Sequence, residues 1–422
     1  MFYTSTRKNA PAVRASDAIM QGLAPDGGLY IPQSFPSLSA LPYGEISSYP
    51  ELAFEVLAPF FEEDPLLELL PEICVDAFNF PVSLHPLGEQ QMVLELFGGP
   101  TAAFKDFGAR FLAASMEQIL RQRGEQLTIL VATSGDTGGA VAAAFAGKER
   151  IRVKVLFPKG RVSDRQKQQL TCWGGNIEAY EVDGSFDDCQ RMVKEAFMDK
   201  GLSMAHNLSS ANSINLGRLL PQSVYYVYAS QVFEKAFGAK PTIIIPSGNV
   251  GNATAAYWAH TMGAPIDRIV LALNANRTIA DYLASGEYEG RSSVQTLANA
   301  MDVGDPSNME RLFALYPTIE EMRAMLTAYS VDDEQIRHTI GEVYKESGYI
   351  LCPHTATAER VRRDYFADKP SIIVATAHPA KFEQTVEPLV GKSIDIPEQL
   401  AALLDKPTEY RSIGPDYRAL FA

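Results

Sequence analysis

Short apolar runs alternate with amphipathic stretches along most of the chain beyond residue 91. Runs such as Ile151–Phe157 and Thr242–Pro246 are almost wholly apolar, which is typical of strands buried on both faces. The segment Phe104–Gln122 instead repeats apolar residues at helical spacing. We also expect strands at Met92–Phe97, Thr128–Thr133, Ile269–Asn274 and Ser371–Thr376, and helices at Ala140–Ala146 and Ala253–Met262. This alternation predicts an α/β fold, with parallel sheets covered by helices on both faces.

The first 91 residues lack this rhythm. They are rich in proline and acidic residues, which punctuate short helical stretches. A chain of 422 residues is long enough for two or three domains. We therefore expect an N-terminal region at 1–91, a smaller α/β domain at 92–220 and a larger α/β domain at 221–422.

Composition narrows the range of partners. The net charge of −14 argues against nucleic acid or an anionic membrane surface, since either needs a concentrated basic face. The apolar runs are too short to span a bilayer, and the first residues show no signal peptide, so we expect a cytoplasmic protein. Four cysteines are scattered without paired spacing, and the six histidines form no H-E-x-x-H pattern. We expect neither disulfides nor a bound metal.

Lys105 is the most informative single residue. It begins the helix that follows a turn of small residues at Gly98–Ala103. A positive charge is unfavourable at a helix N-terminus, so a lysine there is more easily understood if it is neutralised as an imine. Most lysines are simply solvated, and this segment alone leaves that alternative open. Together with the anion-binding loops described next, it suggests a Schiff base with the aldehyde of a phosphorylated cofactor.

The loop Ser247–Asn252 follows a buried strand and opens a helix. Gly248 and Gly251 allow a tight turn in which successive backbone N–H groups can face one anion, and the helix dipole adds to this. The loop has neither the lysine of a P-loop nor the spacing of a dinucleotide fingerprint, which disfavours ATP and dinucleotides. A plain strand–helix connection that needs glycine for its turn is the alternative.

The loop Ser134–Gly139 stands in the same setting. Its hydroxyls at Ser134 and Thr137, with the amides that follow, could hold a carboxylate. Asp136 is unwelcome beside an anion and is better placed to accept a hydrogen bond. A helix N-cap is the alternative for this acid.

Two further segments carry candidate ligands. Ser209–Arg218 gathers amide and hydroxyl donors beside one arginine, which suits a second phosphate or carboxylate. A polar helix cap with Arg218 in a structural ion pair accounts for the same residues. Thr376 ends an apolar strand, where its hydroxyl could bond a cofactor ring or merely cap the strand.

Taken together, these segments resemble the threonine synthases of the fold-type II group of pyridoxal-phosphate enzymes. The resemblance runs nearly end to end, and the order and spacing of its motifs make it specific. The motifs are Gln21–Leu23 with Gly27–Tyr30 and Pro32, Pro100–Phe107, Thr133–Gly138, Gly174–Ile177, Ser210–Asn215, Pro246–Gly251, Asn299–Val303 and Thr376–Lys381.

The resemblance implies a fold of two open, mostly parallel sheets, similar to tryptophan synthase β, and a role for each matched residue. Lys105 forms the Schiff base with pyridoxal 5′-phosphate and moves protons. Thr376 bonds the pyridine nitrogen, and Asp136 matches the position that contacts the cofactor's 3′-oxygen, where many relatives carry asparagine. The cofactor phosphate is assigned to the loop Ser247, Gly248, Asn249, Val250, Gly251 and Asn252. Substrate ligands are Ser134, Gly135 and Thr137 for the carboxylate, and Asn212, Ser213 and Arg218 for the phosphate.

The implied reaction is the conversion of O-phospho-L-homoserine and water to L-threonine and phosphate. Such an enzyme is a carbon–oxygen lyase of threonine biosynthesis. Its neighbours in the same cofactor group are the alternatives, namely a serine or threonine dehydratase or a β-replacement enzyme. A non-catalytic binder of a phosphorylated metabolite is a further alternative, which the retained lysine disfavours. We expect a monomer or homodimer.

Overall fold

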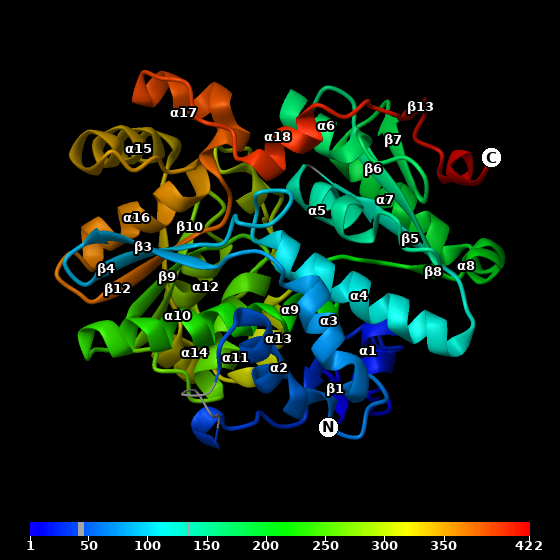
Figure 1. Cartoon of the computed structure of the whole chain (residues 1–422), viewed down its shortest axis with the longest axis horizontal. Coiled ribbons are helices and arrows are strands. Elements are labelled where there is room, and N and C mark those ends of the chain that lie inside the picture. The colour runs from blue at the N-terminus through cyan, green and yellow to red at the C-terminus, as the bar shows by residue number, and fades with distance from the viewer. Residues whose placement is uncertain (41–45, 134) are drawn as a thin grey trace.

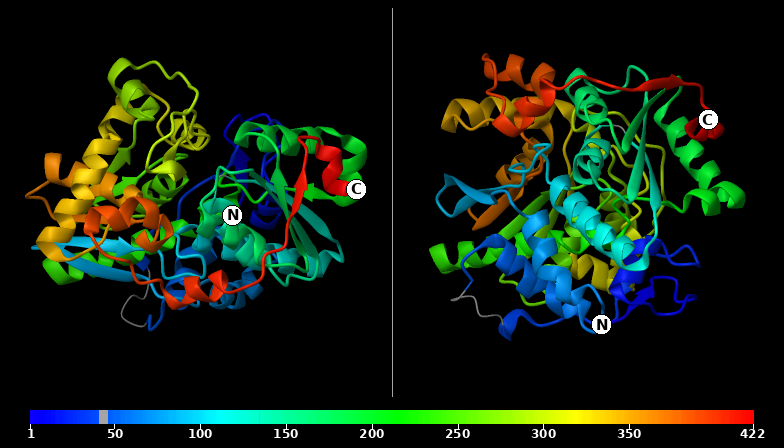
Figure 2. Two further views of the ribbon diagram at one scale, coloured as in Figure 1. Left: turned by 90° about the horizontal axis from the view of Figure 1, so that it is seen from above. Right: turned by 45° about the vertical axis from the view of Figure 1, so that its right-hand side comes forward.

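Two open sheets with helices packed against them form the two lobes of the computed structural model (Figures 1 and 2). The structure describes residues 1–40, 46–133 and 135–422. The predicted α/β class with mostly parallel sheets is confirmed. Every pairing in the sheet of five strands is parallel, and in the sheet of six strands only the edge pair β3–β4 is antiparallel.

The six-stranded sheet has the order β11-β10-β9-β12-β4-β3. Its strands are β3 (Ser83–Gly88), β4 (Gln91–Glu95), β9 (Thr242–Pro246), β10 (Arg268–Leu273), β11 (Thr327–Ser330) and β12 (Ser371–Ala375). In the central strand β9, Ile243 and Ile245 join one hydrophobic core while Ile244 joins the other. Both faces are therefore buried, which explains why this strand is apolar at every position from Ile243 onward.

Helices cover both faces of this sheet (Figure 1). On one side α16 packs on β9, β10 and β12, with α15 and α17 outside it, and on the other α11 packs on β10 with α10 beside it. The helices of this lobe are α10 (Gln222–Phe237), α11 (Gly251–Thr261), α12 (Thr278–Ser285), α13 (Met309–Leu315), α14 (Ile319–Met325), α15 (Asp333–Ser347), α16 (Pro353–Tyr365) and α17 (Glu383–Val390). The last helix, α18 (Glu398–Leu404), reaches the other lobe and packs on α6 (Asp164–Thr171).

The five-stranded sheet has the order β13-β7-β6-β5-β8. Its strands are β5 (Leu127–Ala132), β6 (Ile151–Pro158), β7 (Ile177–Val182), β8 (Leu208–Ser209) and β13 (Arg411–Ile413). Its helices are α4 (Lys105–Arg123), α5 (Asp136–Phe145), α6 (Asp164–Thr171), α7 (Phe186–Met198), α8 (Lys200–His206) and α9 (Leu216–Leu219). Along β6, Val153 and Val155 face the main core while Leu156 faces a smaller cluster with Met192 of α7.

The N-terminal region packs against α4. It contains the small antiparallel sheet of β1 (Tyr3–Ser5) and β2 (Tyr30–Pro32), and the helices α1 (Ala15–Gln21), α2 (Tyr49–Leu57) and α3 (Leu70–Ala77). Phe78, which follows α3, stacks on Phe111 of α4 with ring centroids 6.1 Å apart. Apolar side chains from this region and from both lobes belong to one continuous core.

The sheets divide the chain differently from the expected domain boundaries at two places. The smaller domain was expected to begin at residue 92, but β4 pairs with β12 in the six-stranded sheet, so its strand belongs to the larger lobe. At the other end, β13 leaves the larger lobe and pairs with β7 at the edge of the five-stranded sheet. A run of residues that predicts a strand does not identify the strand with which it pairs, and the three residues of β13 form no apolar run.

Candidate active site

The site lies where the carboxyl ends of several parallel strands face one another, as expected for open α/β sheets. Thr376 directly follows β12, and Ser247 directly follows β9, which is its neighbour in the sheet. The other neighbour of β12 is β4, whose chain continues through Gly98–Phe104 to Lys105. From the five-stranded sheet, β5 leads into α5 and Asp136.

Lys105 is held at the start of α4 by backbone bonds to the loop after β12. The N–H of Phe104 donates to the carbonyl of Thr376 at 2.9 Å, and the N–H of His378 donates to the carbonyl of Ala102 at 3.0 Å. Ala102 adopts a left-handed φ of 53°, which fixes the turn before the helix. The lysine's position is therefore set by the six-stranded sheet, although its helix packs on the other lobe.

The amine of Lys105 faces a cluster of buried charges. Its Nζ donates to Thr137 Oγ1 at 2.9 Å, and the residue is only partly exposed. Burial lowers the pKa of Lys105 to about 8, although the charge of Asp136 opposes this and those of Arg218 and Lys381 add to it. An amine with this pKa is present in neutral form in useful amounts near neutral pH, as a proton-transferring group requires.

Asp136 is the first residue of α5 and is ionised in this setting. Its Oδ1 lies 2.9 Å from Lys381 Nζ, and both side chains are almost fully buried. Burial by itself raises the pKa of Asp136, but the charges of Lys381 and Lys105 outweigh it and hold the pKa well below its usual range. Gly135 occupies the N-cap position, so the N-cap alternative for Asp136 is wrong.

Lys381 also lies in the site, although the sequence around it does not predict this. It closes the motif Thr376–Lys381, but nothing in the spacing indicates that this lysine is buried. In the structure its ammonium donates to the carbonyl of Thr101 at 2.8 Å and pairs with Asp136. Thr101 in turn donates twice to the carboxylate of Asp106, from its N–H at 2.9 Å and its hydroxyl at 2.7 Å.

The loop Ser247–Asn252 has the features of an anion-binding site. Val250 adopts a left-handed φ of 64°, and α11 begins at the next residue, so its first N–H groups have no acceptor within the helix. Asn252 Oδ1 accepts hydrogen bonds from Tyr225 and Tyr226 at 2.6 and 2.7 Å, whereas its Nδ2 has no partner among the described residues. A buried donor left in this state fits a site built for an anion.

Two residues of this loop have well-defined structural roles. A Cβ at Gly248 would lie 2.7 Å from the Cα of Met301, so only glycine fits beneath that backbone. Ser247 donates its N–H to the carbonyl of Ala272 and its hydroxyl to that of Ile245, which places it at the base of the loop and leaves Gly248–Asn252 to face a ligand. These features fit the phosphate of pyridoxal 5′-phosphate.

The segment Ser209–Arg218 adjoins this loop. Asn249 Nδ2 donates to Ser213 Oγ at 2.7 Å, and Asn212 and Ser213 are both partly exposed. Arg218 is buried; its Nη1 donates to the carbonyl of Ala211 at 2.6 Å, and its Nε has no partner among the described residues. Burial lowers the pKa of Arg218 to about 10, with Asp106 opposing the effect. The alternative for this segment included a polar helix cap. Asn215 forms such a cap at the start of α9, where its side chain accepts from the Gly217 N–H.

The structure brings the predicted site residues together at the meeting edges of the two sheets, with one exception. Ser134 lies outside the described residues. Three residues that the sequence pattern does not mark as functional also lie here: Tyr225 and Tyr226 bond Asn252, and His354 is buried close enough for its pKa to respond to Asp136 and Lys105. Burial lowers the pKa of His354 to about 4, and its Nε2 accepts from the Ala300 N–H, so it serves as a neutral acceptor.

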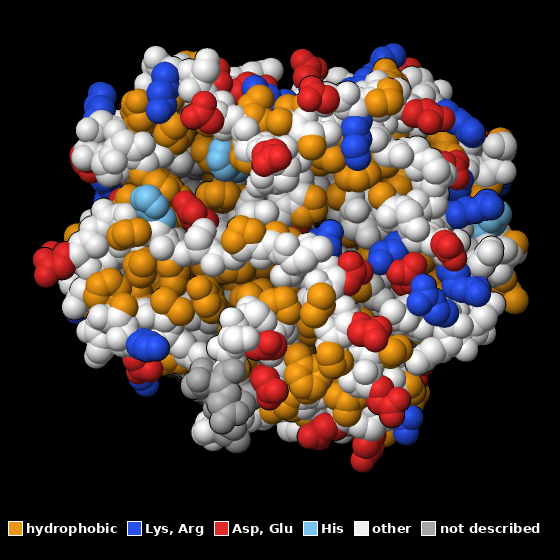
Figure 3. Space-filling view, viewed as in Figure 1, with side chains coloured by type: hydrophobic (Ala, Val, Ile, Leu, Met, Phe, Trp, Pro, Cys, Tyr) orange, Lys and Arg blue, Asp and Glu red, His pale blue; other side chains and the backbone are white. Residues whose placement is uncertain are grey.

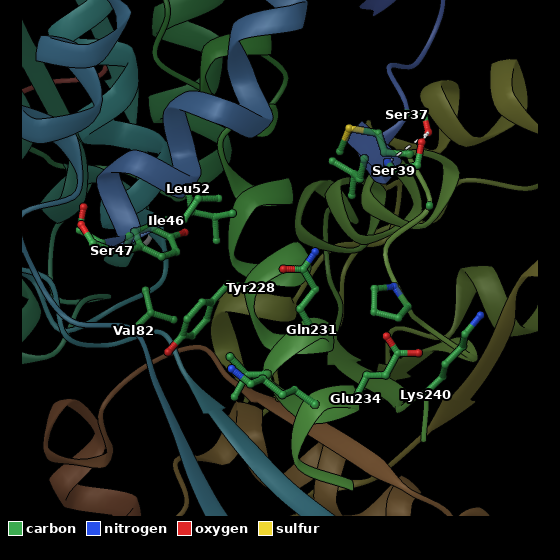
Figure 4. A pocket seen from close by; sticks show the side chains of 18 residues that line it. Ser37, Ser39, Ile46, Ser47, Leu52, Val82, Tyr228, Gln231, Glu234 and Lys240 are labelled. Atoms are coloured by element: carbon green, nitrogen blue, oxygen red, sulfur yellow. Dashed lines mark hydrogen bonds between the residues drawn. The ribbon is translucent and has the colours of Figure 1, made fainter. Parts of the chain in front are cut away.

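A cavity of about 930 Å³ lies elsewhere, between α2 and α10 (Figure 4). Tyr228, Gln231 and Glu234 project into it from α10, opposite Leu52 of α2. It shares no residue with the predicted site. On the face seen in Figure 3, basic and acidic side chains are interspersed. In the described ranges, no helix is long and apolar enough to cross a bilayer, and no three His, Cys, Asp or Glu side chains are grouped to hold a metal ion.

Comparison with known proteins agrees with this architecture. A family model described as "Pyridoxal-phosphate dependent enzyme" matches residues 88–372. Models for the "Threonine synthase N terminus" and "Threonine synthase, C-terminal" match residues 2–78 and 355–421. The fold and the site thus define a pyridoxal-phosphate-dependent enzyme of fold type II.

Similarity to individual proteins narrows the class further. The chain is 38% identical to the threonine synthase of Escherichia coli over 414 residues, which cover 97% of this chain and 95% of that protein. It is 40% identical to that of Haemophilus influenzae, over 92% of this chain and 91% of the relative. The structure matches the PLP-bound threonine synthase from Brucella melitensis with a TM-score of 0.94 and 35% identity, over 100% of this chain and 98% of the other. This chain belongs to the threonine synthase family.

Proposed function

We propose that this chain converts O-phospho-L-homoserine and water to L-threonine and inorganic phosphate. In the net reaction, the bond from Cγ to the phosphate oxygen breaks and Cγ gains a hydrogen to become a methyl group. Cβ loses one hydrogen and gains a hydroxyl group from water, whose remaining proton leaves with the phosphate. The placement of Lys105 supports the chemistry, because a partly exposed residue whose amine has a pKa near 8 faces a set of anion-binding groups. Threonine synthase relatives that match over nearly the whole chain support the substrate.

Pyridoxal 5′-phosphate, when bound, supplies an electron sink for negative charge that develops on the substrate carbons. Gly248–Asn252 and the N-terminus of α11 would hold its phosphate, Thr376 would face its ring, and Asp136 its 3′-oxygen. Lys105 would be its covalent partner. These assignments are proposals that the orphan Asn252 Nδ2 and the close approach at Gly248 support.

The remaining steps of the reaction are carried by side chains of this protein. The neutral amine of Lys105 can take a proton from the substrate and return it, because burial lowers its affinity for that proton. Thr137 keeps the amine aimed, since its hydroxyl accepts at 2.9 Å from Nζ. Arg218, Asn212 and Ser213 would bind the substrate phosphate and stabilise it as it leaves. The amides of Gly135 and Thr137 would bind the substrate carboxylate.

Cofactor use is tested first by the visible absorbance of the purified protein. Borohydride should fix pyridoxal to one peptide, and that peptide should contain Lys105. A stable adduct on another lysine would overturn the assignment of Lys105. A dehydratase of the same cofactor group is the second candidate, and it would release a keto acid from serine or threonine instead of phosphate from phosphohomoserine.

Compartment and assembly stay predictions. We propose a cytoplasmic enzyme that acts as a monomer or homodimer on its small-molecule substrate, without a nucleic-acid or membrane partner. The net charge of −14 disfavours a nucleic-acid or anionic membrane partner. Light scattering on the purified protein reports the assembly, and a stable tetramer or larger complex would contradict it.

A further inference from the structure

The ion pair between Lys381 and Asp136 joins the two lobes at the site. Lys381 lies in the short helix η5 (Pro379–Phe382) after β12 of the six-stranded sheet, and Asp136 opens α5 after β5 of the five-stranded sheet. The N–O distance is 2.9 Å, and the two side chains are 1% and 4% exposed. Removing one partner of such a pair would leave an uncompensated buried charge, which strongly perturbs its surroundings.

Further hydrogen bonds hold Lys381 and its short helix in place. Lys381 Nζ also donates to the carbonyl of Thr101 at 2.8 Å, and the Lys381 N–H donates to the carbonyl of His378. Arg165 of α6 donates to the carbonyl of Ala380 in the same short helix. Moving the ammonium away from Asp136 would therefore also break its bond to the Thr101 carbonyl.

Asp136 is also a neighbour of the Lys105 amine. Thr137, which follows Asp136 in the first turn of α5, accepts the hydrogen bond from Lys105 Nζ at 2.9 Å. A carboxylate in this place would attract the nearest cation. Apart from the pairing with Lys381, its other side-chain partner in the described structure is Gln166, whose Nε2 lies 3.4 Å away.

We propose that Lys381 is a positioning residue that occupies the Asp136 carboxylate, so that the Lys105 amine is left without a counter-ion and free to exchange protons. The role of this free amine in catalysis rests on the proposed function. The charge balance around Lys105 follows from the geometry alone, and the two can be tested separately.

The charged and titratable groups that act on this amine or on its charged neighbours come from five elements. Asp136 of α5 raises the pKa of Lys105, whereas burial, Arg218 of α9 and Lys381 of η5 lower it. His354 of α16 is buried in the same field and is neutral near pH 7, because burial lowers its pKa to about 4. Asp106 of α4 interacts with Lys381 and Arg218. With Lys381 removed, Asp136 is left to pair with Lys105.

The test measures the titration of Lys105 in the full chain freed of cofactor. Brief acetylation with acetic anhydride modifies only neutral amines, so the yield on the Lys105 peptide, read by mass spectrometry from pH 5 to 11, gives the midpoint. Lys381→Met should raise that midpoint by about one pH unit or more, the size of effect that a nearby opposite charge has on a pKa. Asp136→Asn should lower it. Lys392→Met, at an exposed lysine of the same lobe, should leave it unchanged.

The double variant Asp136→Asn with Lys381→Met separates charge balance from a structural role. If Lys381 acts by occupying Asp136, the double variant should titrate at or below the wild-type midpoint. A folded Lys381→Met protein with an unchanged midpoint would overturn the proposal and leave Lys381 as a structural link between the lobes. If Lys381→Met does not fold, the Asp136→Asn variant provides the test. An unchanged Lys105 midpoint in Asp136→Asn would also overturn the proposal.

This result does not depend on turnover. If the midpoints shift as expected but phosphohomoserine yields no phosphate, the proposed function fails and the charge balance stands. If phosphate is released at the normal rate but the midpoints do not shift, the proposed function stands and the role of Lys381 falls.

Discussion

Thr376 accepts a hydrogen bond from the Phe104 N–H at 2.9 Å, so the strand end at β12 directly fixes the residue before Lys105. The same backbone segment continues to Lys381, which pairs with Asp136 across the two lobes. The reactive amine is thus positioned by both sheets. Its neighbours can be substituted one at a time without altering the sequence of the loop Ser247–Asn252.

Removing the amine should abolish turnover while the fold remains. Lys105 makes one side-chain hydrogen bond among the described residues, to Thr137, and lies at the start of a long helix, so Lys105→Ala removes little packing. Loss of the proton-transferring group alone costs about 10²- to 10⁴-fold in rate. We expect a loss at the upper end or beyond, since the covalent partner is lost as well, with an unchanged circular dichroism spectrum. Near wild-type phosphate release by this variant would rule out the assignment.

Gly248→Ala should weaken cofactor binding through the phosphate. The added Cβ would meet the Met301 backbone at 2.7 Å, so the loop must shift. We expect the dissociation constant of pyridoxal 5′-phosphate to rise about tenfold or more, since misplacing even one charge-assisted hydrogen bond costs about 1.5–3 kcal/mol. Titration of the visible band measures it.

The matched control is Gly341→Ala in α15, where the nearest atom to the new Cβ is 3.8 Å away. Its affinity should equal that of the wild type. Pyridoxal without phosphate separates the mechanisms, because Gly248→Ala should affect its binding much less. An equal loss for both compounds would mean that the loop does not hold the phosphate.

Arg218→Ala should weaken substrate binding more than cofactor binding. The buried guanidinium has an Nε without a partner in the described structure, which suits an anion that arrives with the substrate. We expect KM for phosphohomoserine to rise about tenfold or more, at about 1.5–3 kcal/mol for a charge-assisted bond. The dissociation constant of pyridoxal 5′-phosphate should change little.

Arg268→Ala, at an exposed position in β10, is the control for removing an arginine. Because Arg218 also holds the Ala211 carbonyl at 2.6 Å, the melting temperature of each variant must be measured alongside. Equal losses in substrate and cofactor affinity would place Arg218 outside the substrate site.

Asp106 should make stability fall as the pH rises from 4 to 7. Burial raises its pKa to about 6, although the bonds from Thr101 oppose this. The unfolded chain releases this proton near pH 3.8, so the folded state gains from holding it at low pH and loses that gain as the pH passes 6. Each pKa unit corresponds to about 1.4 kcal/mol, so the full effect is at most ~3 kcal/mol.

Asp106→Asn replaces the titrating carboxyl group with an amide that does not titrate. The difference in melting temperature between the variant and the wild type should therefore shift in favour of the variant as the pH rises from 4 to 7. Circular dichroism melts at three pH values measure it. A difference that stays constant with pH would show that Asp106 is ionised throughout this range.

Features that depend on local pattern could be predicted from the sequence alone. Strands such as β9 are apolar because both faces are buried, and the loops after β9 and β12 reach the site because parallel strands end at one edge. The strand β7 could not be predicted in this way, because its sequence from Ile177 to Val182 includes Glu178 and Glu181 and forms no apolar run.

Contacts between residues that are far apart in the sequence could not be predicted from the local pattern either. Lys381 follows a strand end like many surface lysines, and only the fold brings Asp136 to it. The spacing of Tyr225 and Tyr226 indicates a core position and says nothing of their hydroxyls, since the shared acceptor, Asn252, lies on another helix. The position of β4 depends on the sheet that its backbone joins, which its own residues do not encode.

The central claim is tested most directly by the products that the purified chain forms from O-phospho-L-homoserine in the presence of pyridoxal 5′-phosphate. Threonine and inorganic phosphate are to be measured in the same reaction, by amino-acid analysis and a phosphate assay. We predict that they appear in equal amounts and that Lys105→Ala forms neither. Phosphate with a keto acid in place of threonine, or no phosphate from a folded and cofactor-loaded protein, would contradict this prediction.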